Sequence, residues 1–98
     1  MSFAYTYHFE LLKNEAEELV FKELKTQLDA QAPEMCRCED CVMDMAAMAL
    51  NTVKPMYRYS LLGKLYAAHV VNEQAYADSV QQAVANAVAK VSANPSHQ

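Results

Sequence analysis

A single glycine, Gly63, occurs among the 98 residues of this chain. Glycine-rich phosphate-binding loops need several residues without a Cβ atom, and the sequence therefore excludes them. A β-sandwich with many tight turns is disfavoured for the same reason. Alanine, which has the highest intrinsic helix propensity, is abundant. We therefore expect an all-α fold, a small three- to four-helix domain, in a chain long enough for one domain.

The charge and hydropathy of the chain exclude several classes of protein. Acidic residues outnumber basic ones by 12 to 8, which gives a net charge of −4. A general nucleic-acid binder needs a basic surface, so none is expected here. No apolar run approaches the roughly 18 residues of a membrane span, and the N-terminus lacks the pattern of a signal peptide. We expect a cytoplasmic protein whose cysteines are reduced.

Hydrophobic periodicity predicts a first helix over residues 14–32, with Asn14 as its cap and Pro33 beyond its end. A second helix is predicted over residues 40–53, capped by Asp40. This second helix is apolar nearly all round, which predicts that most of its sides are buried.

The remaining part of the chain divides into an irregular stretch and a third helix. Asn51 and Pro55 are stop signals for the second helix. Residues 54–71 fit an extended segment followed by a turn and a short helix or strand, and residues 72–92 fit a third helix. The expected core positions recur every three or four residues: Leu12, Ala16, Val20, Leu24, Leu28, Val42, Met45, Ala46, Ala49, Leu50, Val53, Tyr76, Val80, Ala83, Val84, Ala87, Val88 and Val91. Leu19 and Phe21 widen the apolar stripe of the first helix.

The C-terminal third of the chain is poor in charge. Residues 67–98 carry only Glu73, Asp78 and Lys90 as charged side chains. A helix of this kind is expected to be covered on more than one face, and a second subunit is the expected cover. We therefore expect a homodimer with helices packed across the interface; an exposed surface of alanine and glutamine is the alternative. In this interpretation residues 1–13 form an N-terminal arm, residues 14–95 the helical domain, and residues 96–98 a tail.

The three cysteines of the chain lie within six residues, as Cys36, Cys38 and Cys41. Three thiolates at this spacing can reach one tetrahedral metal ion, and zinc accepts sulfur ligands without redox chemistry. His97, His69, His8, Asp44 or a water are candidates for the fourth ligand, and His97 would tie the C-terminal tail to the loop. Three thiols without a metal are the alternative. A thioredoxin-like redox pair is disfavoured because no strand precedes the motif.

Several residues match the pattern of one protein family. They are Asn14, Glu17 and Val20, then the cysteine loop, then Ala49, Leu50, Asn51, Pro55 and Tyr57, and finally Gly63. From about residue 14 to residue 95 the chain resembles the late competence development protein ComFB family, in its cysteine-bearing branch. The resemblance implies a small helical dimer that binds zinc through its cysteines and a further C-terminal cysteine. This chain has no fourth cysteine, and His97 lies in the comparable stretch.

The resemblance also implies a receptor for cyclic dinucleotides, chiefly cyclic di-GMP and in some cases cyclic di-AMP. Such ligands need cations for their phosphates and flat side chains for their bases. Tyr57 and Tyr59 are candidates for base stacking, while Lys54, Arg58 and Lys64 are candidates for phosphate binding. The alternative is that both tyrosines are core residues and that Arg58 is a surface charge.

Two hypotheses about function follow. In the first, the chain is a non-enzymatic regulatory protein with a structural zinc site that binds a cyclic dinucleotide and signals to a protein effector. In the second, it is a zinc-stabilised interaction or adaptor protein, associated with competence or surface behaviour, that binds no small ligand. An enzyme is not expected, because the sequence has no Ser-His-Asp set and no H-E-x-x-H motif.

Overall fold

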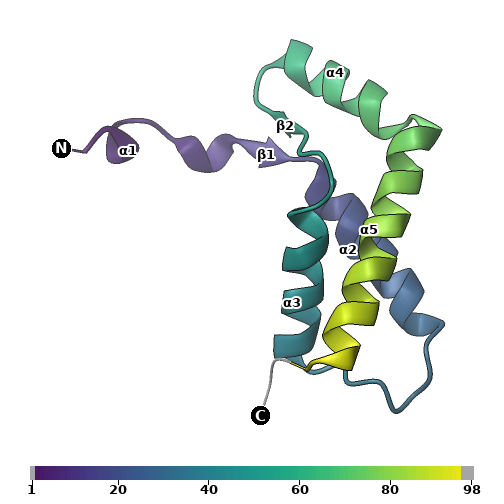
Figure 1. Ribbon diagram of the computed structural model, residues 1–98. Coiled ribbons are helices and arrows are strands. Elements are labelled where there is room, and N and C mark those ends of the chain that lie inside the picture. The colour runs from purple at the N-terminus through teal and green to yellow at the C-terminus, as the bar shows by residue number, and fades with distance from the viewer. Residues whose placement is uncertain (1, 96–98) are drawn as a thin grey trace.

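Five α-helices dominate the computed structural model, which describes residues 2–95 (Figure 1). A small antiparallel pair of strands joins residues that are far apart in the sequence, and it aligns Lys13 with Arg58 and Asn14 with Tyr57. The predicted all-α class is therefore confirmed. The elements in chain order are α1 (Phe3–Thr6), the 3₁₀ helix η1 (Phe9–Leu11), β1 (Lys13–Asn14), α2 (Ala16–Asp29), α3 (Glu39–Leu50), β2 (Tyr57–Arg58), α4 (Leu61–Val71) and α5 (Gln74–Ala93).

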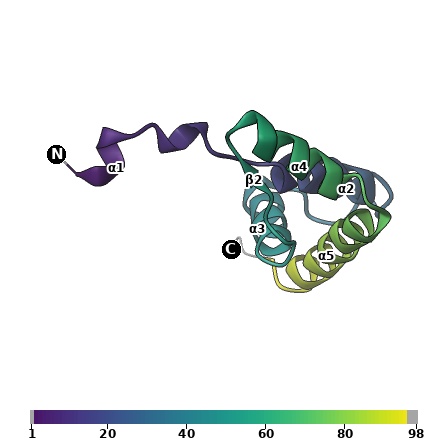
Figure 2. The ribbon, with the colours of Figure 1, turned by 90° about the horizontal axis from the view of Figure 1, so that it is seen from above.

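Helices α2, α3 and α5 pack together and enclose the core, as the view from above also shows (Figure 2). Met45 of α3, Val20 of α2 and Val84 of α5 are among its largest fully buried side chains. All seven core positions predicted for α5 are buried. The remaining buried apolar residues are Ala16, Leu24, Leu28, Cys41, Ala49, Val53, Met56 and Ala67.

The first predicted helix is shorter than its periodicity indicates. Helix α2 begins at Ala16 rather than at Asn14, and it ends at Asp29, ahead of Pro33. Asn14 lies in β1, where its side chain Oδ1 accepts the backbone N–H of Ala16 at 3.1 Å. Leu12 therefore precedes the helix and is exposed, contrary to the prediction that it belongs to the core. Phe21, predicted on the apolar stripe of this helix, is exposed as well.

The second helix begins one residue earlier than predicted, because Cys38 rather than Asp40 caps it. Asn51, predicted as a stop signal, is the C-terminal cap, so α3 ends at Leu50 rather than at the predicted Val53. The prediction that most sides of α3 are buried is wrong for the single chain, since Met43 is 61% exposed and Met48 is exposed as well. One face of α3 meets α2 and α5, and no other element of residues 2–95 covers the opposite face.

Helix α4 lies within residues 54–71, where the sequence did not decide between a short helix and a strand. Ser60 caps it by accepting the backbone N–H of Gly63 at 3.1 Å. A Cβ atom at Gly63 would lie 3.3 Å from the Ser60 hydroxyl oxygen, so the one glycine leaves room for this cap. Only Ala67 of α4 is buried, and Leu61 and Leu62 are 74% and 78% exposed.

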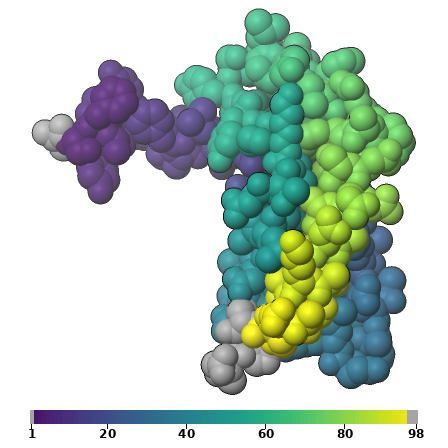
Figure 3. Space-filling model, in the orientation of Figure 1, coloured from purple at the N-terminus to yellow at the C-terminus, as the bar shows by residue number. Residues whose placement is uncertain are grey.

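The N-terminal arm was predicted over residues 1–13; its described part ahead of β1, residues 2–12, extends away from the helices and is called the arm below (Figure 3). Aromatic residues alternate along the arm as they do in a strand, but the arm forms the short turns α1 and η1 instead. None of its residues is buried, and the rings of Phe3, Tyr7 and Phe9 contact one another. No helix within the described part of the chain is long and apolar enough to cross a membrane.

Candidate functional site

The sulfur atoms of Cys36, Cys38 and Cys41 all lie within 4.8 Å of one another. Cys41 is fully buried against the core, whereas Cys36 and Cys38 are half-buried at its edge. A tetrahedral zinc–thiolate centre has Zn–S bonds of about 2.3 Å and therefore sulfur atoms about 3.8 Å apart. A contraction of at most about 1 Å would bring these three sulfurs to that spacing. The donor set thus fits a thiophilic metal ion.

The local fold brings the three sulfurs together because the helix begins inside the motif. Cys38 is the N-terminal cap of α3, and its Sγ accepts the backbone N–H of Cys41 at 3.4 Å. Arg37 turns away toward the preceding loop, where its Nη2 donates to the carbonyl oxygen of Gln31 at 3.3 Å. The loop thereby keeps a cation close to the motif without placing it between the sulfurs.

The electrostatics at the start of α3 favour thiolate. The N–H of Cys41 that donates to Cys38 Sγ lowers the pKa of the Cys38 thiol, and the N–H of Asp40 contributes in the same direction. The positive end of the helix dipole acts similarly. The thiolate is the form of cysteine that binds metals. The sulfur atom of Cys38 is therefore both the cap of α3 and a candidate metal ligand.

Within residues 2–95, the group of candidate ligand atoms consists of the three sulfurs and includes no fourth ligand. The His8 ring lies 3.0 Å from the Glu10 carboxylate, and the His69 ring lies 3.8 Å from the Glu73 carboxylate. Asp44 is the sixth residue of α3 and does not belong to the sulfur group either. His97 lies outside the described residues.

The second candidate region is the segment from Lys54 to Lys64, at the opposite end of α3 from the cysteines (Figure 1). Tyr57 and Tyr59 are 62% and 68% exposed, so neither is the core residue of the alternative interpretation. The side chains of Lys54 and Lys64 are exposed as well, and neither lysine makes an ion pair with a described residue. Aromatic faces and cations therefore lie on one solvent-facing segment.

Arg58 is the exception in this segment, because it faces the start of α2. Its Nε lies 2.5 Å from the Glu15 carboxylate oxygen Oε1, and both side chains are 26% exposed. With Tyr57, the pair lines a surface hollow of about 620 Å³, whose wall also holds Glu17 and Glu18. Arg58 was predicted to bind phosphate, but in this structure its guanidinium is already paired with the Glu15 carboxylate.

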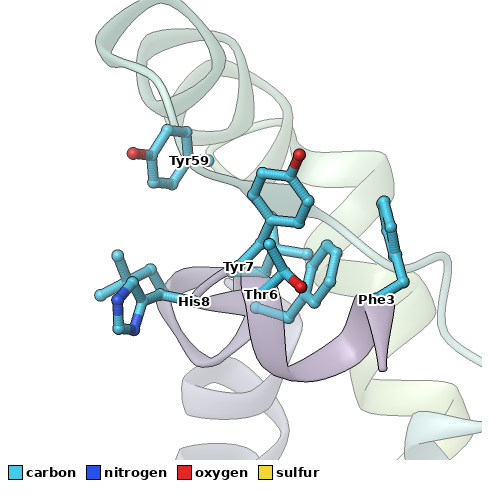
Figure 4. Close-up of a pocket in the computed structure, with 8 residues that line it drawn as sticks. Phe3, Thr6, Tyr7, His8 and Tyr59 are labelled. Carbon is cyan, nitrogen blue, oxygen red and sulfur yellow. The ribbon is translucent and has the colours of Figure 1, made fainter. Parts of the chain in front are cut away.

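Tyr59 contributes to a second hollow, of about 520 Å³, which the arm forms with it. The close-up shows Tyr59 across from Tyr7 and His8, with Phe3 at the far side (Figure 4). One aromatic residue of the candidate ligand segment thus lies beside the aromatic residues of the arm.

Sequence reasoning missed the residues that hold the segment in place. Asn14 Oδ1 accepts the backbone N–H of Met56 at 2.8 Å, and the N–H of Glu15 donates to the carbonyl oxygen of Met56 at 2.8 Å. The hydroxyl of Tyr76, whose pKa burial raises, donates to the carbonyl oxygen of Lys54 at 2.6 Å. Only the appearance of Asn14 and Pro55 in one family pattern linked these distant parts of the sequence.

Comparison with known proteins gives one family and one fold. The model of the family "Late competence development protein ComFB" matches residues 13–95. Among solved structures, that of the late competence protein ComFB from Bacillus subtilis is 26% identical to this chain, with a TM-score of 0.68. The match covers 87% of this chain and 92% of that one. No curated protein matches this sequence.

Proposed function

Because the chain belongs to the late competence development protein ComFB family, we propose that it is a non-enzymatic regulatory protein with a structural zinc site and a cyclic dinucleotide ligand. Zinc would be held by Cys36, Cys38 and Cys41, and the ligand would bind at the segment from Lys54 to Lys64. The proximity of the three sulfurs supports the metal site. The exposure of Tyr57 and Tyr59 supports the ligand site, since bases need uncovered aromatic faces.

Zinc in this position is structural. It would join the loop before α3 to the first turn of that helix, and it would neutralise thiolate charge at the edge of the core. His97 is our proposed fourth ligand, because it stands in the C-terminal stretch in which the family places a further cysteine.

Elemental analysis of the purified protein tests the metal. We expect about one zinc ion per chain in the unaltered protein, and less than half of that after Cys36→Ser. His97→Ala should weaken retention of zinc against a chelator, whereas the matched control His69→Ala should not. A protein that contains no zinc and does not bind it when refolded with the metal contradicts the proposal.

The nucleotide site is proposed from chemical complementarity. A cyclic dinucleotide carries two phosphates and two purine bases, which suit cations and aromatic faces respectively. Lys54 and Lys64 are exposed cations, and Arg58 can bind a phosphate bidentately once Glu15 releases it. A homodimer would double this set, which suits a ligand that has two-fold symmetry.

Isothermal titration calorimetry with cyclic di-GMP and with cyclic di-AMP tests the ligand. We expect binding of at least one of them, weakened about tenfold or more by Arg58→Ala. Arg37→Ala is the matched control, because it removes the same side chain at the cysteine end of α3 and should leave binding unchanged. The absence of heat with either nucleotide at high concentration would exclude the proposal.

A metal-stabilised adaptor without a small ligand is the second candidate. The aromatic arm favours it, since Phe3, Tyr5, Tyr7 and Phe9 are exposed and suit contact with a protein effector. This candidate predicts a protein partner whose retention does not change when cyclic dinucleotide is added, and the regulatory proposal predicts that it does.

A further inference from the structure

The ion pair between Glu15 and Arg58 links the candidate ligand segment to the N-terminal arm. Glu15 lies between β1 and α2, and the arm ends immediately before β1. Arg58 lies in β2, directly opposite Lys13 of β1. The pair therefore bridges the point at which the arm joins the helices.

The arm has few other attachments. Within residues 2–95, every hydrogen bond made by residues 2–12 joins two residues of the arm itself. None of these residues is buried. They meet the segment from Lys54 to Lys64 in the hollow that they share with Tyr59 and, through Leu12, in the hollow that Tyr57 and Arg58 line. The position of the arm thus depends on β1, on the bonds of Asn14 and Glu15 to Met56, and on the ion pair.

The Glu15 carboxylate and a phosphate group compete for the same donors. Both are anions whose oxygen atoms accept guanidinium N–H groups, and the edge of Arg58 that contains Nε, which the Glu15 carboxylate contacts, accommodates one of them at a time. A ligand shifts a conformational equilibrium only by its different affinity for the two states. The two states here are Arg58 paired with Glu15 and Arg58 separated from Glu15. A phosphate that binds Arg58 has a higher affinity for the second state and therefore favours it.

We propose that Glu15 is a built-in competitor of the ligand, and that a phosphate of the cyclic dinucleotide displaces it from Arg58 and loosens the arm. The inference rests on the proposed function, of which it gives the regulation. In the ligand-free state the carboxylate lowers the affinity for the messenger and keeps the arm in place. In the bound state Arg58 holds phosphate, and the arm, whose aromatic residues are already exposed, is free to move to another surface.

Glu15→Gln tests the proposal, because it removes the charge and keeps the shape of the side chain. We expect this variant to bind cyclic di-GMP at least about fivefold more tightly than the unaltered protein, a coupling of ordinary size. Glu17→Gln is the matched control: it removes a neighbouring charge from the same hollow, and Glu17 has no ion-pair partner among the described residues. Its affinity should change by less than about twofold.

Amide hydrogen exchange of the arm provides the second measurement. Without nucleotide, residues 2–14 should exchange faster in Glu15→Gln than in Glu17→Gln, and cyclic di-GMP should accelerate exchange in the unaltered protein. Glu15→Asp, which keeps the charge on a shorter side chain, serves if the glutamine variant does not fold, and it should show the same two changes to a smaller degree.

The outcomes separate this inference from the proposed function. If the unaltered protein binds cyclic di-GMP and Glu15→Gln binds no tighter than Glu17→Gln, the competition is wrong and the proposed function stands. If none of the four proteins binds either cyclic dinucleotide, both are wrong. Binding by Glu15→Gln alone supports the competition in its strongest form.

Discussion

Helices α4 and α5 follow one another along the chain and are both apolar, but they relate to the core in opposite ways. Seven residues of α5 are buried, whereas α4 buries only Ala67. The apolar residues of α5 recur every three or four positions and form one face. Those of α4 surround the helix, so it packs one side and leaves Leu61, Leu62 and Leu65 exposed. The comparison shows that periodicity, rather than apolar content, decides what a single chain can bury.

The largest expected effect tests the packed side of this comparison. Met45 is fully buried between α2, α3 and α5, and Met45→Ala should lower the free energy of unfolding by about 2–5 kcal/mol. Met43→Ala, on the exposed side of the same helix, should change it by less than about 0.5 kcal/mol. Urea denaturation of the two variants measures both. Equal losses would mean that the exposed face of α3 is covered by a partner.

We propose that the chain forms a homodimer and that the exposed side of α4, with Leu61, Leu62 and Leu65, contributes to its interface. Leu62→Glu should leave the unfolding of the monomer unchanged and raise the dimer dissociation constant at least about tenfold, since it buries a charge in the interface. Ala85→Glu adds the same charge on an exposed position of α5 and is the matched control. Light scattering across a dilution series measures the dissociation constant. If the protein is monomeric at every concentration, the proposed dimer is wrong. If Leu62→Glu leaves the dissociation constant of the dimer unchanged, the interface does not include this side of α4.

The success and failure of the sequence predictions follow the same division. The stripe of α5 and the stop signals Pro33 and Asn51 act locally. They predicted both ends of α5 to within two residues, whereas α2 and α3 each end three residues before the predicted Ala32 and Val53. Asn14 was assigned as a helix cap because its sequence context is that of a cap. In the structure its side chain also accepts the N–H of Met56, which lies 42 residues away. Glu15 was missed for the same reason, since its partner Arg58 lies 43 residues along the chain. Contacts of this range are absent from periodicity and spacing.

The cysteine cluster was predicted only in part. The spacing of the cysteines predicted that their sulfur atoms lie close together, but it did not predict the role of each sulfur. Cys38 caps α3, a function that the sequence analysis gave to Asp40. In metal-free protein Cys38→Ser should therefore retain the cap, and Cys38→Ala should be less stable than Cys38→Ser by about 1 kcal/mol. With zinc present, both variants should lose the metal equally. Thermal unfolding with and without a chelator separates the two roles, and equal stability of the metal-free variants would refute the cap.

The smallest expected effect concerns the surface beside the cysteine loop. Lys25 Nζ donates to Asp29 Oδ2 at 2.7 Å, which holds the pKa of Asp29 below its ordinary value, and the charge of Arg37 in the loop acts in the same direction. The stabilisation from a depressed carboxyl pKa is present above the unfolded value of about 3.9 and is lost as the pH falls through the folded value. Lys25→Ala should raise the pKa of Asp29 toward its ordinary value, and Arg37→Ala should raise it less. Titration of the Asp29 carboxyl by NMR measures both shifts. An Asp29 pKa that does not respond to Arg37→Ala would mean that the loop holds the arginine farther from the end of α2 than its hydrogen bond to Gln31 places it.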